Sequence, residues 1–214
     1  MTEPDVALTD YAIVALCTAF SVGTGRQLPA DSRLRGLWIA FFVSIGAGAL
    51  FGGTVHGFFL DQAGLGYRIL WPATLLALGV TASSMWFLGA ALQLRGAAAT
   101  WVQRFAVAQL IVYSGIVLFV TSEFYVAMLA SFPATVFLLV ALVLVLKRAP
   151  DRRLMLGVAG FLLMFVGAAV QQLRVSIHPV YFSHNVLFHL IQGAALFLIY
   201  VGARSRTAAP RSSR

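Results

Sequence analysis

Charged residues are scarce in this chain. Only 10% of its 214 residues are Asp, Glu, Lys or Arg, whereas 60% are apolar and the mean hydropathy is +0.90. Ordinary soluble domains have about 25% charged residues, most of them at the surface. The composition therefore excludes an ordinary soluble domain and predicts an integral membrane protein.

Cysteine and lysine are also almost missing. The single cysteine, Cys17, stands in an apolar run, so an intrachain disulfide is excluded. The single lysine, Lys147, lies far from the last apolar stretch, which excludes a retinal pigment held through a lysine in the final helix. The first ten residues, MTEPDVALTD, are acidic where a secretory signal is basic, so we expect the first apolar segment to be a retained helix.

Seven apolar stretches are long enough to cross a membrane, which takes about 20 helical residues. Six of them contain no Asp, Glu, Lys or Arg, and the first is interrupted only by Asp10. The pattern predicts an all-α bundle of seven transmembrane helices over residues 1–203, with a very tight turn at Thr121, Ser122 and Glu123. A disordered basic tail is expected at 204–214. The expected spans are residues 6–22, 36–60, 69–94, 105–122, 124–146, 154–173 and 175–203.

The basic residues predict the orientation of this bundle. Of the 15 Lys and Arg, 13 follow the first, third, fifth and seventh stretches, and only Arg68 and Arg174 lie on the opposite side. The positive-inside rule then places the N-terminus outside and the C-terminus in the cytoplasm, as in a bacterial inner membrane. Because the net charge of +8 comes from short loops and the tail, it does not indicate a nucleic-acid partner.

The histidines are the most informative polar residues. On the predicted topology all four fall at the outer ends of the spans, in the same layer as Asp61, Glu123 and Asp10. A histidine in hydrocarbon is costly unless it is paired or ligated, and imidazole is the commonest metal ligand. A lone interfacial histidine usually bonds only a neighbour or water, but four on one side favour a metal site near the outer surface. The four are His56, His178, His184 and His189.

Two short motifs resemble a known superfamily. GALFGGTVHGFF in the second span and NVLFHLIQG in the seventh are similar to signatures of the seven-helix superfamily that unites alkaline ceramidases with adiponectin-receptor-like (progestin and adipoQ receptor) proteins. The resemblance is carried by His56, Asp61 and the Phe188-His189-Leu190 step, and by the number of spans. It implies a zinc ion held by three histidines near one membrane face, whose bound water hydrolyses a lipid amide such as ceramide.

The chain departs from these signatures at three positions. Gly52 stands where the superfamily has a serine, the acid follows His56 by only five residues, and Asn185 occupies the place of the first histidine of the final pair. On a continuous helix His184 and His189 would diverge by roughly 140° and could not share an ion. We therefore expect Asn185 to cap the last helix, so that His184 lies on non-helical backbone and turns inward.

These residues lead to three hypotheses. The first is a zinc-dependent hydrolase of lipid amides or esters near the outer leaflet, with His56, His184 and His189 as metal ligands and Asp61 orienting the zinc-bound water or moving its proton. The second is a non-enzymatic receptor, sensor or transporter subunit on the same scaffold. The third is a b-type haem protein with His56 and His189 as axial ligands. The sequence leaves open whether Asp10, Glu123 or His178 joins the site.

Overall fold

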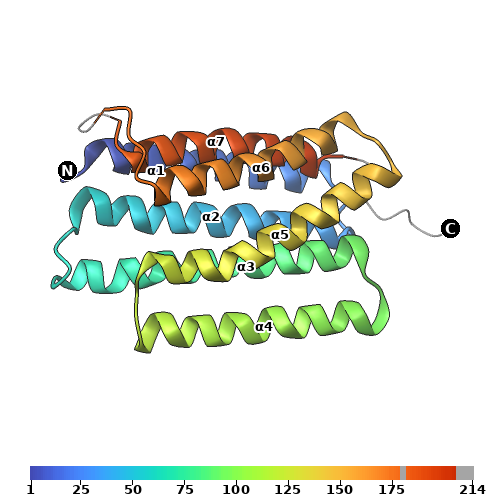
Figure 1. Ribbon diagram of the computed structural model, residues 1–214, viewed down its shortest axis with the longest axis horizontal. Coiled ribbons are helices and arrows are strands. Elements are labelled where there is room, and N and C mark those ends of the chain that lie inside the picture. The colour runs from blue at the N-terminus through green and yellow to red at the C-terminus, as the bar shows by residue number, and fades with distance from the viewer. Residues whose placement is uncertain (179–181, 206–214) are drawn as a thin grey trace.

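The computed structural model describes residues 1–178 and 182–205, and within them the chain forms seven helices (Figure 1). Each is long and apolar enough to cross a membrane, which confirms the predicted all-α seven-helix fold. Helices suit this composition because they satisfy every backbone polar group internally, without water. Their bounds are α1 Pro4–Gln27, α2 Arg33–Phe58, α3 Leu65–Gln93, α4 Gly96–Phe119, α5 Phe124–Arg148, α6 Arg152–Gln172 and α7 His184–Ala203.

Two helix starts differ from the prediction by nine residues, whereas the others differ by at most four. Helix α4 begins at Gly96, nine residues before position 105, because Arg104 interrupts the apolar run without interrupting the helix. Helix α7 begins at His184 rather than near position 175, because the preceding loop pairs the backbones of His178 and Phe182 in an antiparallel bridge. The tight turn predicted at Thr121, Ser122 and Glu123 does lie between α4 and α5.

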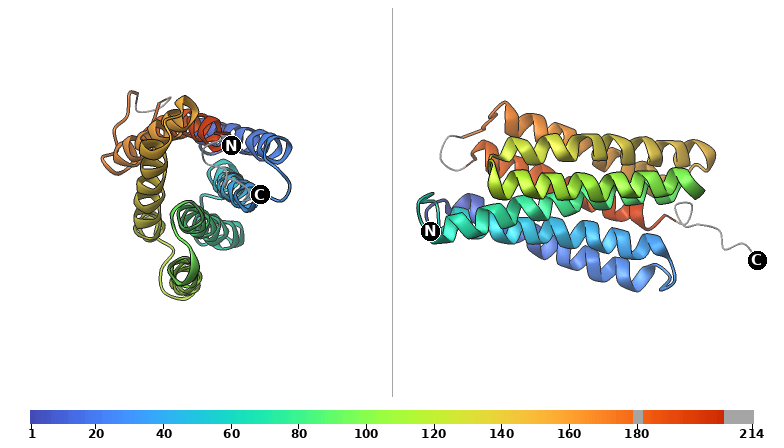
Figure 2. Two further views of the ribbon diagram at one scale, coloured as in Figure 1. Left: turned by 90° about the vertical axis from the view of Figure 1, so that its right-hand side faces the viewer. Right: turned by 90° about the horizontal axis from the view of Figure 1, so that it is seen from below.

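Six helices form a ring, and the seventh lies outside it. Around the ring, α1 packs on α2, α2 on α3, α3 on α5, α5 on α6, α6 on α7, and α7 on α1, while α4 packs chiefly on the outer side of α3 (Figure 2). The centre of the ring is filled by large side chains that are almost fully buried. They include Trp38, Phe41, Phe42, Leu88, Leu138, Phe161 and Leu196.

Glycines allow the backbones of α6 and α7 to lie in direct contact. A Cβ atom on Gly157 would lie 2.9 Å from the Cα of Gly202, and a Cβ atom on Gly202 would lie even closer to the Cα of Gly157. Small residues at such crossings let two backbones touch, which is a common way for membrane helices to associate. This contact fixes α7, and with it His189, relative to the rest of the bundle.

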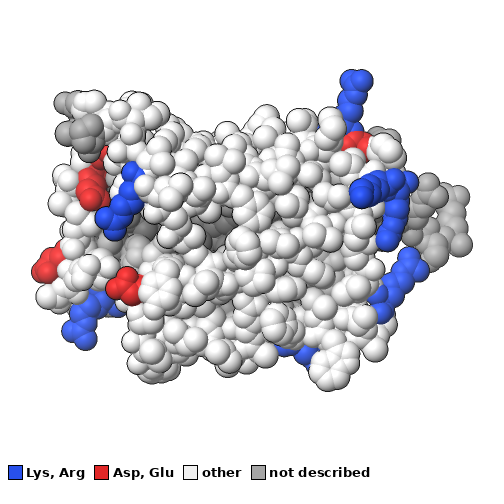
Figure 3. Space-filling view, viewed as in Figure 1, with Lys and Arg blue, Asp and Glu red and all other residues white. Residues whose placement is uncertain are grey.

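Because successive helices alternate in direction, one end of the bundle collects the starts of α1, α3, α5 and α7 and the ends of α2, α4 and α6. We call this the site end; it is the left-hand end in Figure 1. His56 lies near the end of α2 and His184 and His189 near the start of α7, so these histidines share this end. Lys and Arg gather mainly at the opposite end on the face shown in Figure 3.

At the opposite end the chain leaves α7 through Arg204 and Ser205. The Ser205 hydroxyl donates a hydrogen bond to Oδ2 of Asp151, at 2.9 Å, and the Arg204 guanidinium lies 5.2 Å from the centre of the Tyr200 ring. The rest of the tail predicted to be disordered, residues 206–214, lies outside the described residues.

Candidate functional site

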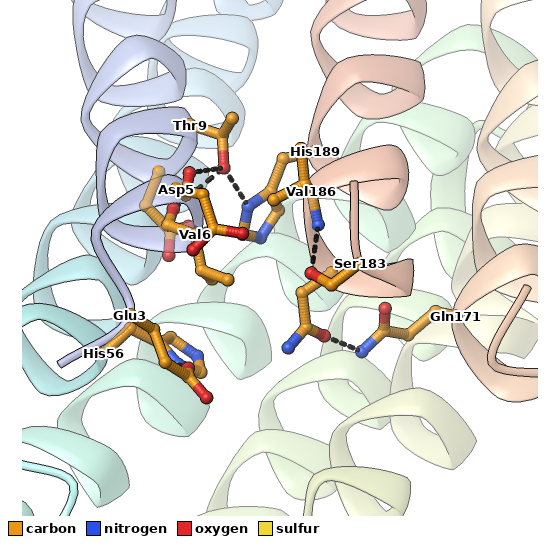
Figure 4. Close-up of polar contacts among 11 residues, drawn as sticks. Glu3, Asp5, Val6, Thr9, His56, Gln171, Ser183, Val186 and His189 are labelled. Atoms are coloured by element: carbon orange, nitrogen blue, oxygen red, sulfur yellow. Dashed lines mark hydrogen bonds and ion pairs between the residues drawn. The ribbon is translucent and has the colours of Figure 1, made fainter. Parts of the chain in front are cut away.

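A cavity of about 290 Å³ lies inside the helix ring near the site end. All six ring helices contribute to its wall, so residues far apart in the sequence meet there. Figure 4 shows several of them converging from α1, α2, α6 and α7. Two of the three histidines predicted to bind zinc face this cavity. Its polar lining consists of Asp10, His56, Thr74, Gln171, Asn185, His189 and Gln192.

His189 is held from one side by Thr9 of α1. Its Nδ1 atom lies 2.9 Å from the Thr9 hydroxyl oxygen, which is itself 2.8 Å from the Val6 carbonyl oxygen one turn earlier. A threonine in a helix usually donates its hydroxyl proton to such a carbonyl. The hydroxyl oxygen then accepts from Nδ1–H of His189, and the neutral ring presents the lone pair of Nε2 on its other side.

Asp10 lies opposite that Nε2 atom, with its Oδ1 atom 3.3 Å away. The residue is only 5% exposed although it carries a carboxyl group. It is brought inside by Gly53 of α2, where a Cβ atom would lie 2.6 Å from the Cβ of Asp10 and 3.4 Å from the Ala7 carbonyl oxygen. A glycine at this position therefore lets α1 lie directly against α2 and turns Asp10 toward the cavity.

His56 is held by the first residues of the chain. Its Nδ1 atom lies 2.6 Å from Oε2 of Glu3, and its carbonyl oxygen accepts from the backbone N–H of Glu3 at 3.1 Å. The backbone N–H of Thr2 bonds the Gly57 carbonyl in the same way, at 3.0 Å. These bonds satisfy carbonyls that the end of a helix leaves without partners. Glu3 and Thr9 thus each fix the Nδ1 side of one cavity histidine.

The start of α7 corrects the prediction for Asn185. Ser183, not Asn185, is the N-cap, and its side chain accepts from the N–H of Val186 at 3.4 Å. His184 is consequently the first residue of the helix instead of lying on non-helical backbone, and it is not part of the cavity wall. Asn185 does line the cavity, where its Oδ1 atom accepts from Nε2 of Gln171 at 2.8 Å.

Asp61, the predicted catalytic acid, lies away from the cavity. It stands in the turn between α2 and α3, exposed, and its Oδ1 atom accepts from the backbone N–H of Ala63 at 3.0 Å. Glu123 occupies the N-cap position of α5 and His178 the loop before α7, and neither lines the cavity. The acid that does line it is Asp10. The signal for it in the sequence was a single carboxyl group inside an apolar run.

The predicted three-histidine zinc site is not assembled in this arrangement. His56 and His189 face the cavity, but His184 does not. Within residues 1–178 and 182–205, no group of three or more His, Cys, Asp or Glu side chains is arranged to hold a metal ion. The residues present therefore do not fit the ligand set that the superfamily resemblance implies.

A second cavity adjoins the first. It has a volume of about 180 Å³ and lies between α5 and α6, against α2, α3 and α7. Its lining is mostly aromatic, aliphatic and methionine side chains, among them Phe41, Met85, Phe132, Phe161, Met164 and Phe165. We call the first cavity the polar chamber and the second the apolar slot. The two share six wall residues, Ile45, Leu78, Phe124, Gln171, Phe188 and Gln192.

The comparisons with known proteins give one match. Residues 6–208 match a family of unknown function, DUF6962. No curated protein and no solved structure matches the chain. Because the family match covers nearly the whole chain, the chain belongs to this family.

Proposed function

We propose that this DUF6962 protein binds an amphipathic lipid, with the head group in the polar chamber and the hydrocarbon chain in the apolar slot. The observation that carries this proposal is the shared wall of the two cavities. A polar site that continues into an apolar one matches a molecule with a polar end and an apolar end. Ligand sites in proteins generally combine a mostly apolar lining with a few convergent polar groups.

The position of the apolar slot supports entry from the bilayer. Helices α5 and α6 meet at the end opposite the site and separate toward the site end, and Figure 3 shows a recess between them on this face. Phe132, which lines the slot, is 60% exposed, so the slot reaches the lipid-facing surface. A hydrocarbon chain could therefore move from the bilayer into the slot without crossing water.

Among the three hypotheses, this arrangement favours the receptor, sensor or transporter subunit, because binding requires only the two cavities. The zinc-dependent hydrolase remains a prediction, and its third ligand and its acid are both outside the polar chamber. The bis-histidine haem also remains a prediction, and an absorption spectrum of the purified protein tests it. The charge asymmetry supports an outer position of the site in a bacterial inner membrane.

A pair of neighbouring substitutions tests lipid binding. Ala168 of α6 lines the slot, whereas Ala169 is exposed on another face of the same helix. We expect Ala168→Phe to fill the slot and Ala169→Phe to leave it open. Lipids that remain with the purified protein after exchange into a synthetic phosphatidylcholine bilayer are extracted and identified by mass spectrometry.

The native protein and Ala169→Phe should retain the same amphiphile in near-stoichiometric amount, and Ala168→Phe should lose most of it. Equal retention by both variants, or none by the native protein, would contradict the proposal.

A further inference from the structure

The polar chamber is lined by hydrogen-bond acceptors and by the carboxyl group of Asp10. Asp10 and His189 contribute a carboxylate and a ring nitrogen, and the buried Oε1 atom of Gln171 has no hydrogen-bond partner in the protein. Among the residues that the structure describes, no Lys or Arg lines this chamber. A phosphate or carboxylate head group would find no fixed positive charge there, whereas a group that donates hydrogen bonds would find several acceptors.

Asp10 and His189 both line the chamber, where a bound donor could reach them. With Nδ1–H of His189 engaged by Thr9, the lone pair of Nε2 faces Oδ1 of Asp10 at 3.3 Å, so an ionised Asp10 and His189 together present two acceptors to a bound donor. A charge-assisted hydrogen bond between these groups would measure about 2.7–2.9 Å. The other carboxyl oxygen of Asp10, Oδ2, lies 4.0 Å from the point where a Cβ atom would stand on Gly52, which is an ordinary contact distance.

The remaining titratable groups near the chamber do not supply a balancing cation. On α2, Nδ1 of His56 lies 2.6 Å from Oε2 of Glu3, so any positive charge on His56 is already balanced by the Glu3 carboxylate. On α1, Asp5 adds a further carboxyl group in the first turn. Helices α3, α5 and α6 contribute Trp71, Thr74, Phe124 and Gln171 among their residues on the wall, and none of these four is charged.

We propose that the head group of the bound lipid is a protonated amine, which donates hydrogen bonds to Asp10 and to Nε2 of His189. An ammonium group has three donors and no acceptor, so it matches a wall that offers acceptors on several sides. Its charge also balances a carboxylate that lies within the span of a membrane helix, where unpaired charges are costly. This inference rests on the proposed lipid binding and names the class of lipid.

The test compares three probes with the same ten-carbon chain and different head groups: decylamine, decanol and decyl phosphate. Decylamine keeps its positive charge between pH 5 and 8, because alkylammonium groups have pKa values of about 10. Each probe is titrated against the full-length protein in phosphatidylcholine nanodiscs, and binding is followed by native mass spectrometry. Asp10→Asn removes the carboxylate with little change of shape, and Asp151→Asn, at the opposite end of the bundle, serves as the matched control.

We expect the native protein to bind decylamine at least tenfold more tightly than decanol, and decyl phosphate least. Asp10→Asn should reduce the affinity for decylamine at least tenfold and leave decanol unchanged, while Asp151→Asn should change neither. If all probes fail to bind, lipid binding itself fails and this inference with it. If the probes bind but decylamine has no advantage, or keeps it in Asp10→Asn, only the amine assignment is overturned. Should Asp10→Asn not fold, the order of the three affinities in the native protein decides the question.

Discussion

Replacing Gly53 by alanine should disturb the site more than the same change at its neighbour Gly52. At Gly53 the new Cβ atom would lie 2.6 Å from the Cβ of Asp10 and 3.4 Å from a backbone oxygen of α1, so helix α1 must move. Forced overpacking costs about 1–3 kcal/mol, from which the better helix propensity of alanine removes up to about 1 kcal/mol. With that gain realised in full, the expected net loss is up to about 2 kcal/mol, or up to roughly 8 °C in the unfolding temperature of a chain of this size.

At Gly52 the nearest atom to the new Cβ would be Cγ2 of Thr74, at 3.5 Å, which is an ordinary contact. Gly52→Ala should therefore leave the unfolding temperature unchanged or raise it by up to about 4 °C. The chain provides its own probe for this measurement, because its single cysteine, Cys17, is buried and reacts with a thiol-specific dye only on unfolding. Equal unfolding temperatures for the two variants would refute the conclusion that contact with Gly53 positions α1 and Asp10.

The charges and the histidines lead to three further expected outcomes. A reporter fused after Arg214 should be active only if it functions in the cytoplasm, and activity on the outer side would invert the orientation. Partial burial by itself raises the pKa of Asp151. Hydrogen bonds from Ser205 and from the backbone at the start of α6 lower it, as does the charge of Arg153, and the net result is a pKa below the ordinary 3.8. The stabilising contribution of Asp151 is therefore present above about pH 4 and lost in more acidic solution. The native protein should unfold at a higher temperature than Asp151→Asn at pH 7, and this difference should shrink as the pH falls below about 4. If the purified protein contains zinc, His56→Ala and His189→Ala should each remove it, and full occupancy in either variant would exclude a shared ion.

The seven spans could be predicted because a single property, the scarcity of charge over about 20 residues, indicates them, although α1 contains Asp10 and α4 contains Arg104. The start of α7 was harder, because Ser183 and Asn185 are both favoured N-cap residues and stand two positions apart. Sequence alone could not decide between them. The choice determines whether His184 belongs to the helix. The two-residue error in the predicted N-cap therefore also changed the expected position of His184, one of the three predicted zinc ligands.

Asp10 shows why sequence reasoning did not single out the acid that lines the chamber, although it did single out two of the histidines that line it. His56 and His189 could be found because both stand at similar depth in their apolar runs, at the same end of the bundle. Whether Asp10 faces lipid, water or the bundle interior depends on how closely α1 approaches α2, and that distance depends on a glycine 43 positions away, Gly53. No local pattern around Asp10 contains this information, whereas Asp61 was suggested only by its nearness to His56 in sequence.

The burial of Asp10 is difficult to explain as a contribution to stability. A carboxylate at the centre of a membrane helix costs about 2.5–3.5 kcal/mol by insertion measurements, and the cost at Asp10, the seventh of the 24 residues of α1, is smaller but still unfavourable. The 3.3 Å contact with His189 is too long for a strong hydrogen bond. If the carboxylate serves a ligand instead, Asp10→Asn should raise the free energy of unfolding by about 1–2 kcal/mol in the absence of amphiphile, while weakening decylamine binding at least tenfold. Such a conflict between stability and activity is common at functional sites. The unfolding temperature of the lipid-stripped protein, measured through Cys17, tests this, and a less stable Asp10→Asn would show that Asp10 serves the fold by holding His189.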